Sequence, residues 1–125
     1  MNRLLFWGAV MSFLAVAIGA FGAHVLEERL GLDGMDTYQT GVQYHAVHGL
    51  AMVLAALWAE RFPNERLVRL AGWSFLLGIV LFSGSLYVLV MSGIRTLGAI
   101  TPLGGVAFLA GWGMLAAAAL KLGKK

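Results

Sequence analysis

The chain has 125 residues, of which 60% are hydrophobic and only 12% are charged, and its mean hydropathy is +0.83. Because soluble domains carry about 25% charged residues, this composition excludes an ordinary water-soluble globule and predicts a protein solvated by the lipid bilayer. The net charge of +3 comes from Lys and Arg at the ends of apolar runs, so no nucleic acid is expected as a partner. The absence of cysteine excludes disulfides, thiol redox chemistry and iron–sulfur ligation.

The first apolar run covers residues 4–26 and predicts a membrane-spanning helix. At about 1.5 Å per residue, it is long enough for a bilayer core of roughly 30 Å. The most polar stretch of the chain, residues 27–39, follows it, and Gly31 and Gly34 predict turns there. We therefore expect a loop between the first two helices.

The second helix is predicted over residues 37–59. Asp36, with Gln39 three residues later, matches a capping box at its start. A short charged connection follows, in which Pro63 and Asn64 are expected to end this helix and to cap the next one.

The third and fourth helices are predicted over residues 65–92 and 101–120. They are separated by an apolar loop of about eight residues with a single charge at Arg95. Thr101 followed by Pro102 predicts an N-cap with proline at the first helical position.

The basic residues predict the orientation, because cytoplasmic loops of membrane proteins carry an excess of Lys and Arg. Arg29 and Arg95 fall on one side of this arrangement. The other seven fall on the opposite side: Arg3, Arg61, Arg66, Arg69, Lys121, Lys124 and Lys125. Residues 1–125 are therefore expected to form one all-α domain, a four-helix up-down-up-down bundle with both termini in the cytoplasm.

Small residues recur at a spacing of four in three of the runs. In lipid, such residues let helix backbones approach and gain van der Waals contact. The chain has 17 glycines, and together they predict close helix packing and favour association between copies as a homo-oligomer. The stripes are Ala15, Gly19 and Ala23, then Ser74 and Gly78, then Ala107 and Gly111.

Three histidines form the candidate functional site. His45 and His48 lie three residues apart on the second helix, so they share nearly the same face and lie close enough to hold one ligand or one ion. The predicted topology places His24 at a similar depth, on the outer side of the membrane. Ionisable groups in membrane helices are costly, which makes them candidate functional residues. The residues expected around the histidines are Gln43, Tyr44, Ser83 and Thr101, with Ser85 and Tyr87 at the same level.

Three interpretations of this pocket stay open. The histidines bind a divalent ion or copper, or serve as axial ligands of a haem, because neutral imidazole is a common metal ligand. Alternatively, the pocket binds a solute or a proton in a small transporter or channel, although no acidic residue lies in the middle of a helix. In the third interpretation, the histidines hydrogen-bond between helices, and the protein is a scaffold or accessory subunit.

Enzymatic motifs are absent from the sequence. It contains no GxSxG, no P-loop and no dinucleotide fingerprint. Glu27 and Glu28 lie near a histidine, but acidic residues at a helix end are more often solvated charges. We therefore expect no enzymatic activity and no catalytic residue.

Four segments resemble a family of small membrane proteins of unknown function, typified by YgdD and YwdK. The segments are GAFGAHVLEERL (19–30), TGVQYHAVHGLA (40–51), LFSGSLYVL (81–89) and LGAITPLGGVAFLAGW (97–112). Val25 departs from the family pattern, which usually has glycine at this position. The resemblance implies a four-helix integral protein of the bacterial inner membrane, and it implies no activity.

Overall fold

The computed structural model describes residues 1–123, and Lys124 and Lys125, two of the predicted cytoplasmic charges, lie outside the described residues. All secondary structure within residues 1–123 is helical, and two segments are wider π-helical turns. The elements are α1 (Arg3–Ala17), the π-helix η1 (Ile18–Gly22), α2 (Ala23–Arg61), α3 (Arg66–Gly78), the π-helix η2 (Ile79–Ser83), α4 (Gly84–Ser92), the 3₁₀ helix η3 (Arg95–Ala99) and α5 (Thr101–Gly123).

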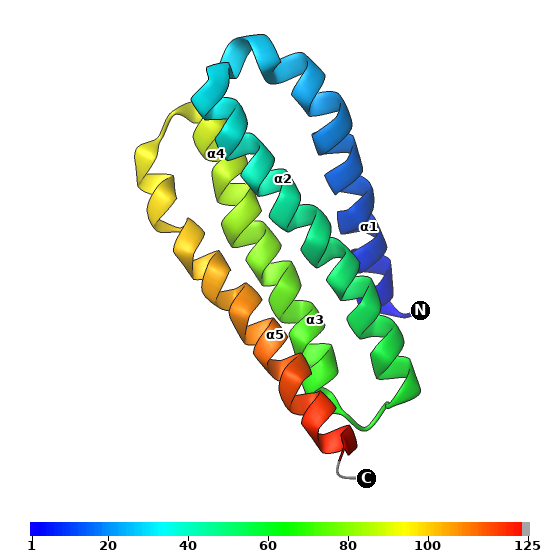
Figure 1. The fold of residues 1–125 in the computed structure, drawn as a ribbon. Coiled ribbons are helices and arrows are strands. Elements are labelled where there is room, and N and C mark those ends of the chain that lie inside the picture. Colours follow the sequence, from blue (N-terminus) through cyan, green and yellow to red (C-terminus); the bar gives the residue numbers. More distant parts are fainter. Residues whose placement is uncertain (124–125) are drawn as a thin grey trace.

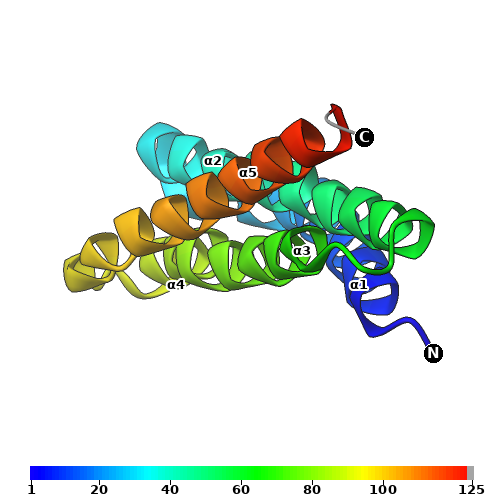
Figure 2. The same cartoon turned by 90° about the horizontal axis from the view of Figure 1, so that it is seen from below.

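Consecutive elements combine into four long helices that lie side by side (Figures 1 and 2). α1 continues through η1, and α3 continues through η2 into α4. Both described chain ends lie toward one end of the bundle, and the connections near Gly31 and Gly93 lie at the other (Figure 1). The four helices of residues 1–123 are each long and apolar enough to cross a membrane.

The polar stretch between the first two helices is helical, which makes the prediction of a loop there wrong. α2 contains this stretch and is broken only at Gly31, whose φ of 67° and ψ of −176° are not helical. Helix resumes directly after Gly31, so Asp36 lies inside a helix and is not its N-cap. Thr40 Oγ1 donates a hydrogen bond to the Asp36 carbonyl at 3.0 Å, as in a regular helical turn. Leu, Glu, Arg and Met favour helix even where the stretch is polar, and a single glycine suffices to turn the chain.

The caps at the other end of the bundle also differ in detail from the prediction. Asn2 caps α1, because its side chain accepts a hydrogen bond from Leu5 N at 3.0 Å. Glu65, rather than the predicted Asn64, caps α3 by accepting from Leu67 N at 3.2 Å. Both side-chain oxygens satisfy backbone N–H groups that have no partner within their helix.

A close helix contact joins α3 and α5 through two reciprocal pairs of glycine and phenylalanine. A Cβ atom added to Gly78 would overlap the ring of Phe108, and one added to Gly111 would overlap the ring of Phe75. Each ring therefore occupies the space that its glycine leaves open. Ser74 Oγ adds a hydrogen bond of 2.6 Å to the carbonyl of Ala107. Ser74 with Gly78, and Ala107 with Gly111, are the two small-residue stripes predicted for the second half of the chain. Close packing through small residues is therefore confirmed there.

The outer faces of the long helices are apolar and exposed. One large exposed residue from each helix shows the pattern: Phe13 (73%), Leu50 (67%), Val80 (58%) and Leu109 (73%). In water such a surface would drive aggregation, whereas lipid tails solvate it without cost. The fold therefore implies contact with a lipid bilayer.

Candidate functional site at the histidines of α2

His48 is buried where α2, α3 and α5 meet, and both of its ring nitrogens have hydrogen-bond partners. Trp112 Nε1 donates to His48 Nε2 at 3.0 Å, and His48 Nδ1 lies 2.7 Å from the Tyr44 carbonyl. Because an indole nitrogen only donates, Nε2 must be the unprotonated acceptor. Nδ1 then carries the proton and donates it to the Tyr44 carbonyl. The two bonds thus require a neutral ring with no free lone pair.

Aromatic rings enclose His48 on the side of α3 and α5. Its ring stacks on Phe108 with a centroid separation of 3.6 Å and an angle of 9° between the planes. Phe75 lies 5.4 Å from the His48 ring in a tilted arrangement, and Phe75 and Trp112 lie 4.9 Å apart. The same two phenylalanines fill the spaces at the glycines of α3 and α5. His48 is therefore part of the interlocked contact among three helices.

His45 is equally buried, with 3% of its surface exposed, but its ring has a partner on a different helix. Its Nδ1 lies 2.9 Å from the hydroxyl of Tyr87 on α4. Its Nε2 is buried and makes no hydrogen bond of good geometry within residues 1–123, and the backbone of Met11 on α1 is the polar group that lies near the ring. One turn later, Gly49 packs against Ser12 of α1, which places His45 on the part of α2 between α1 and α4. The two histidines thus bond to different helices, His45 to α4 and His48 to α5.

Three hydrogen bonds made by hydroxyl groups join helical segments at other points near the site. Ser83 Oγ donates to the Gly41 carbonyl at 2.7 Å and is fully buried. Ser85 Oγ and Thr101 Oγ1 lie 2.6 Å apart, joining α4 to α5. Thr101 is the first residue of α5, so the prediction that its side chain caps this helix is not met. Tyr38 OH also donates to the carbonyl of Ile18 in η1.

The remaining predicted site residues lie at the surface. His24 and Gln43 are exposed, and 42% of the Tyr44 surface is accessible. His24 borders a cavity of about 520 Å³ at the Gly31 bend. None of the other predicted site residues lines this cavity: its other members are Glu27, Gly31, Leu32, Met35 and Gln39. His24 is thus separate from the buried pair.

The predicted site therefore divides into separate contacts. His48 bonds to the Tyr44 carbonyl and to α5, whereas His45 bonds to α4. Ser83 and Thr101 each bond to other groups. His24 and Gln43 are exposed. Within residues 1–123, no group of three or more His, Asp or Glu side chains is placed to hold a metal ion. A metal ion or a haem at the histidines stays a prediction.

Sequence reasoning missed the partners that define the His48 environment, Phe108 and Trp112. The two residues are four apart, so they lie on one face of α5. That spacing was available in the sequence. The pairing of this face with His48 was not, because it depends on how α5 docks against α2 and α3.

Four apolar helices, joined by buried hydrogen bonds and exposing apolar outer faces, define a small polytopic membrane protein. Residues 18–105 match the family model described as "Protein of unknown function (DUF423)", so the chain belongs to this family of unknown function. No solved structure matches the chain.

Curated relatives cover nearly the whole chain. The UPF0382 membrane protein YwdK of Bacillus subtilis is 47% identical over 121 residues, which is 97% of this chain and 98% of that protein. The UPF0382 inner membrane protein YgdD of Escherichia coli K12 is 45% identical over 128 residues, covering 98% of this chain and 92% of that protein. The resemblance predicted from the four sequence segments is thereby confirmed.

Proposed function

We propose that the protein is a non-enzymatic scaffold or accessory protein of the bacterial inner membrane, and that its buried histidines fix the helix bundle. The observation that carries this proposal is the bonding of His48. Both ring nitrogens are used, one by the Trp112 indole and one by the Tyr44 carbonyl. A histidine in this state offers no lone pair to a metal ion and no proton to a substrate.

The first experiment is elemental analysis combined with an absorption spectrum on protein purified without a histidine tag or chelator. The triple variant His24→Ala/His45→Ala/His48→Ala is measured alongside, and both proteins are then titrated with copper and zinc. We expect no metal and no chromophore in either protein, and lower stability in the variant. A near-stoichiometric metal or a haem band that is lost in the variant would refute the structural interpretation.

A ligand-binding or transport function is the second candidate, because one buried nitrogen stands apart. His45 Nε2 makes no hydrogen bond of good geometry within residues 1–123, and an unpaired buried polar atom costs about 1–3 kcal/mol. A solute with a hydrogen-bonding group would satisfy it. This candidate predicts pH-dependent solute flux in proteoliposomes that is lost in His45→Ala and kept in the surface control His24→Ala. Equal flux in the two variants would eliminate His45 as the transport site.

We further propose the up-down-up-down topology with both termini in the cytoplasm. Support comes from the charges: Arg3, Arg66 and Lys121 mark one end of the membrane spans, and Arg29 and Arg95 the other. A reporter that is active only in the cytoplasm, fused after residue 125, should be active. A second reporter that needs export, inserted at the Gly31 bend, should be active as well.

A further inference from the structure

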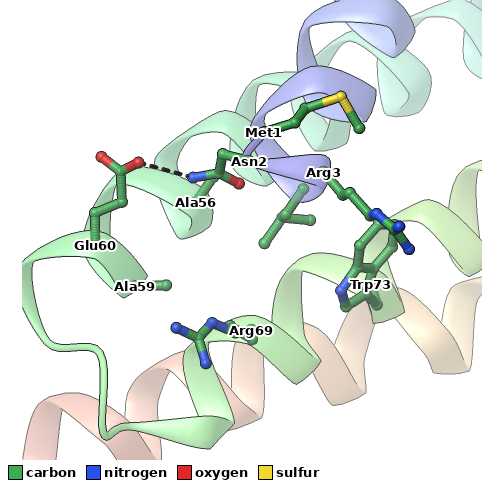
Figure 3. Close-up of a pocket in the computed structure, with 9 residues that line it drawn as sticks. Met1, Asn2, Arg3, Ala56, Ala59, Glu60, Arg69 and Trp73 are labelled. Atoms are coloured by element: carbon green, nitrogen blue, oxygen red, sulfur yellow. Dashed lines mark hydrogen bonds between the residues drawn. The ribbon is translucent and has the colours of Figure 1, made fainter.

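A cavity of about 550 Å³ opens between α1, α2 and α3, near the end of the bundle where both described chain ends lie (Figure 3). Its inner wall is apolar and is formed by the buried residues Leu4, Ala56 and Ala59. Asn2 and Glu60 stand at its edge, joined by a hydrogen bond of 2.9 Å from Asn2 Nδ2 to Glu60 Oε1. The volume lies within the range of about 300–1,000 Å³ that is usual for small-molecule sites.

The charge around this cavity is positive. Arg3 from α1 and Arg69 from α3 line it, and Figure 3 shows both side chains at its rim. Within residues 1–123, neither guanidinium forms an ion pair. The carboxylate of Glu60 is the only acidic group among the lining residues, and it accepts the Asn2 amide. The cavity therefore carries two cationic groups that suit a phosphate, which guanidinium binds with two parallel hydrogen bonds.

The position of the cavity places it at the boundary between membrane and water. Arg3 is the first residue of the membrane span Arg3–Gly22, and Arg69 lies in the first turn of the span Arg66–Ser92. Trp73, one turn further on α3, also lines the cavity and is 38% exposed. Tryptophan concentrates at the head-group level of bilayers, where lipid phosphates lie. Basic pockets between membrane helices bind anionic lipid head groups in this zone.

We infer that this cavity binds the phosphate of an anionic phospholipid, with Arg3 and Arg69 as the phosphate ligands. The apolar wall accepts the glycerol backbone of the lipid, and its acyl chains stay in the surrounding bilayer. A zwitterionic lipid carries an ammonium group as well, which the two arginines repel. The site is independent of the histidine contacts, because it lies at the C-terminal end of α2, about two helical turns beyond His48, and shares no residue with them.

Lipid binding to the full-length protein in a neutral detergent tests this inference. Phosphatidylglycerol and phosphatidylcholine with the same acyl chains are titrated, and bound lipid is counted by native mass spectrometry. The cavity variant is Arg3→Gln/Arg69→Gln. The matched control is Arg61→Gln/Arg66→Gln, which removes the same charge near the same end of the bundle but outside the cavity.

We expect the wild type to prefer phosphatidylglycerol, the cavity variant to bind it roughly 30-fold more weakly, and the control to bind it as the wild type does. The charge-conserving variant Arg3→Lys/Arg69→Lys should keep the preference for phosphatidylglycerol but bind it more weakly than the wild type, because an ammonium group cannot form the two parallel hydrogen bonds. Equal losses in the cavity variant and the control would overturn the inference, because general surface charge would then explain binding. Equal binding of phosphatidylcholine would overturn it too.

Free glycerol phosphate separates a lipid from a soluble phosphate ester. If the site takes a lipid, the free ester at an equal concentration leaves bound phosphatidylglycerol in place. Complete displacement by glycerol phosphate would overturn the assignment to lipid. All four of these arginines are exposed, so the three double variants should retain the helical content and melting temperature of the wild type.

Discussion

The contact between α3 and α5 and the contact between α1 and α2 both depend on glycine, but they are built differently. Between α3 and α5, the rings of Phe75 and Phe108 fill the spaces at Gly111 and Gly78. Between α1 and α2, the backbones themselves approach: a Cβ added to Gly8 would lie 2.9 Å from Val53 N. The first contact interlocks side chains and so fixes the register of the two helices. The contact between α1 and α2, over the described residues, has no such interlocking rings.

Hydrogen bonds near the two ends of the α1–α2 contact set its register instead. Asn2 binds Glu60 at one end, and Tyr38 OH binds the carbonyl of Ile18 at the other. In the most apolar 18 residues of the first membrane span, Arg3–Gly22, 17% of the residues are buried. The corresponding fraction for the second span, His24–Arg61, is 44%. The first helix therefore lies at the edge of the bundle, mostly in lipid, and we expect substitutions there to cost less than in the interlocked half.

The largest effect is expected for Gly78→Ala. The new methyl group would overlap the Phe108 ring, which is already held against His48, so α3 and α5 must separate. We expect a loss of about 3 kcal/mol in the free energy of unfolding, the upper end for overpacking. Unfolding in mixed micelles, followed by far-UV circular dichroism, measures it.

Two glycine variants sharpen this comparison. Gly49→Ala, on the α1–α2 contact, places its methyl 2.9 Å from Ser12 Oγ and 3.1 Å from Ser12 N, a milder overlap than the 2.2 Å at Gly78, so we expect a smaller loss of about 1 kcal/mol. Gly105→Ala meets nothing within 4 Å and should be neutral or stabilising, since alanine favours helix. If Gly49→Ala were as damaging as Gly78→Ala, the distinction between the two contacts would fail.

The next largest effect is expected for His48→Ala. It leaves the Trp112 N–H without its acceptor and removes the ring stacked on Phe108, at a cost of about 2 kcal/mol. Trp112→Phe removes the donor together with part of the aromatic ring system that packs on Phe75, so it should cost more than about 0.6 kcal/mol, the average for hydrogen bonds in membranes. The double variant should cost less than the sum of both. Strict additivity in this cycle would show that the two side chains are not coupled.

A smaller effect is expected for Tyr87→Phe. This change deletes the hydroxyl that bonds His45 Nδ1 and keeps the ring, so the expected loss is about 0.6 kcal/mol. The same unfolding assay measures it. A loss above that of His48→Ala would mean that the α2–α4 contact, and not the interlocked half, dominates stability.

The smallest effect is expected for Phe13→Ala on α1. The side chain is 73% exposed to lipid, which solvates it in the folded and the unfolded state alike. The free energy of unfolding should change by less than about 0.5 kcal/mol. A loss comparable to that of Gly78→Ala would indicate that this face is covered, as in the homo-oligomer that the glycine content favours.

The sequence predicts the helical class, the four membrane spans and the small-residue stripes, because these follow from composition and spacing along one helix. It does not predict which ring fills each glycine space. Likewise, the spacing of His45 and His48 gives the face that they share on α2. Their divergence follows from the neighbours, since Tyr87 approaches from α4 and Trp112 from α5. Such partners depend on how the helices dock.

The π-helical turns were also beyond sequence reasoning. Ile18–Gly22 and Ile79–Ser83 are as apolar as the α-helical segments beside them, so hydropathy gives no sign of a wider turn. The turn at Gly31 is predicted by the sequence, but the helix on both sides of it is missed for a different reason. A polar stretch was read as a loop, although charged and long apolar side chains favour helix in water as well.

The reciprocal pairing of rings and glycines has an evolutionary consequence. Neither Gly78 nor Gly111 can enlarge while Phe108 and Phe75 keep their size. Across the family, residues at positions 78 and 108 should therefore covary, as should those at 75 and 111, with a larger residue on one helix accompanied by a smaller one on the other. The positions on the α1–α2 contact are expected to drift more independently.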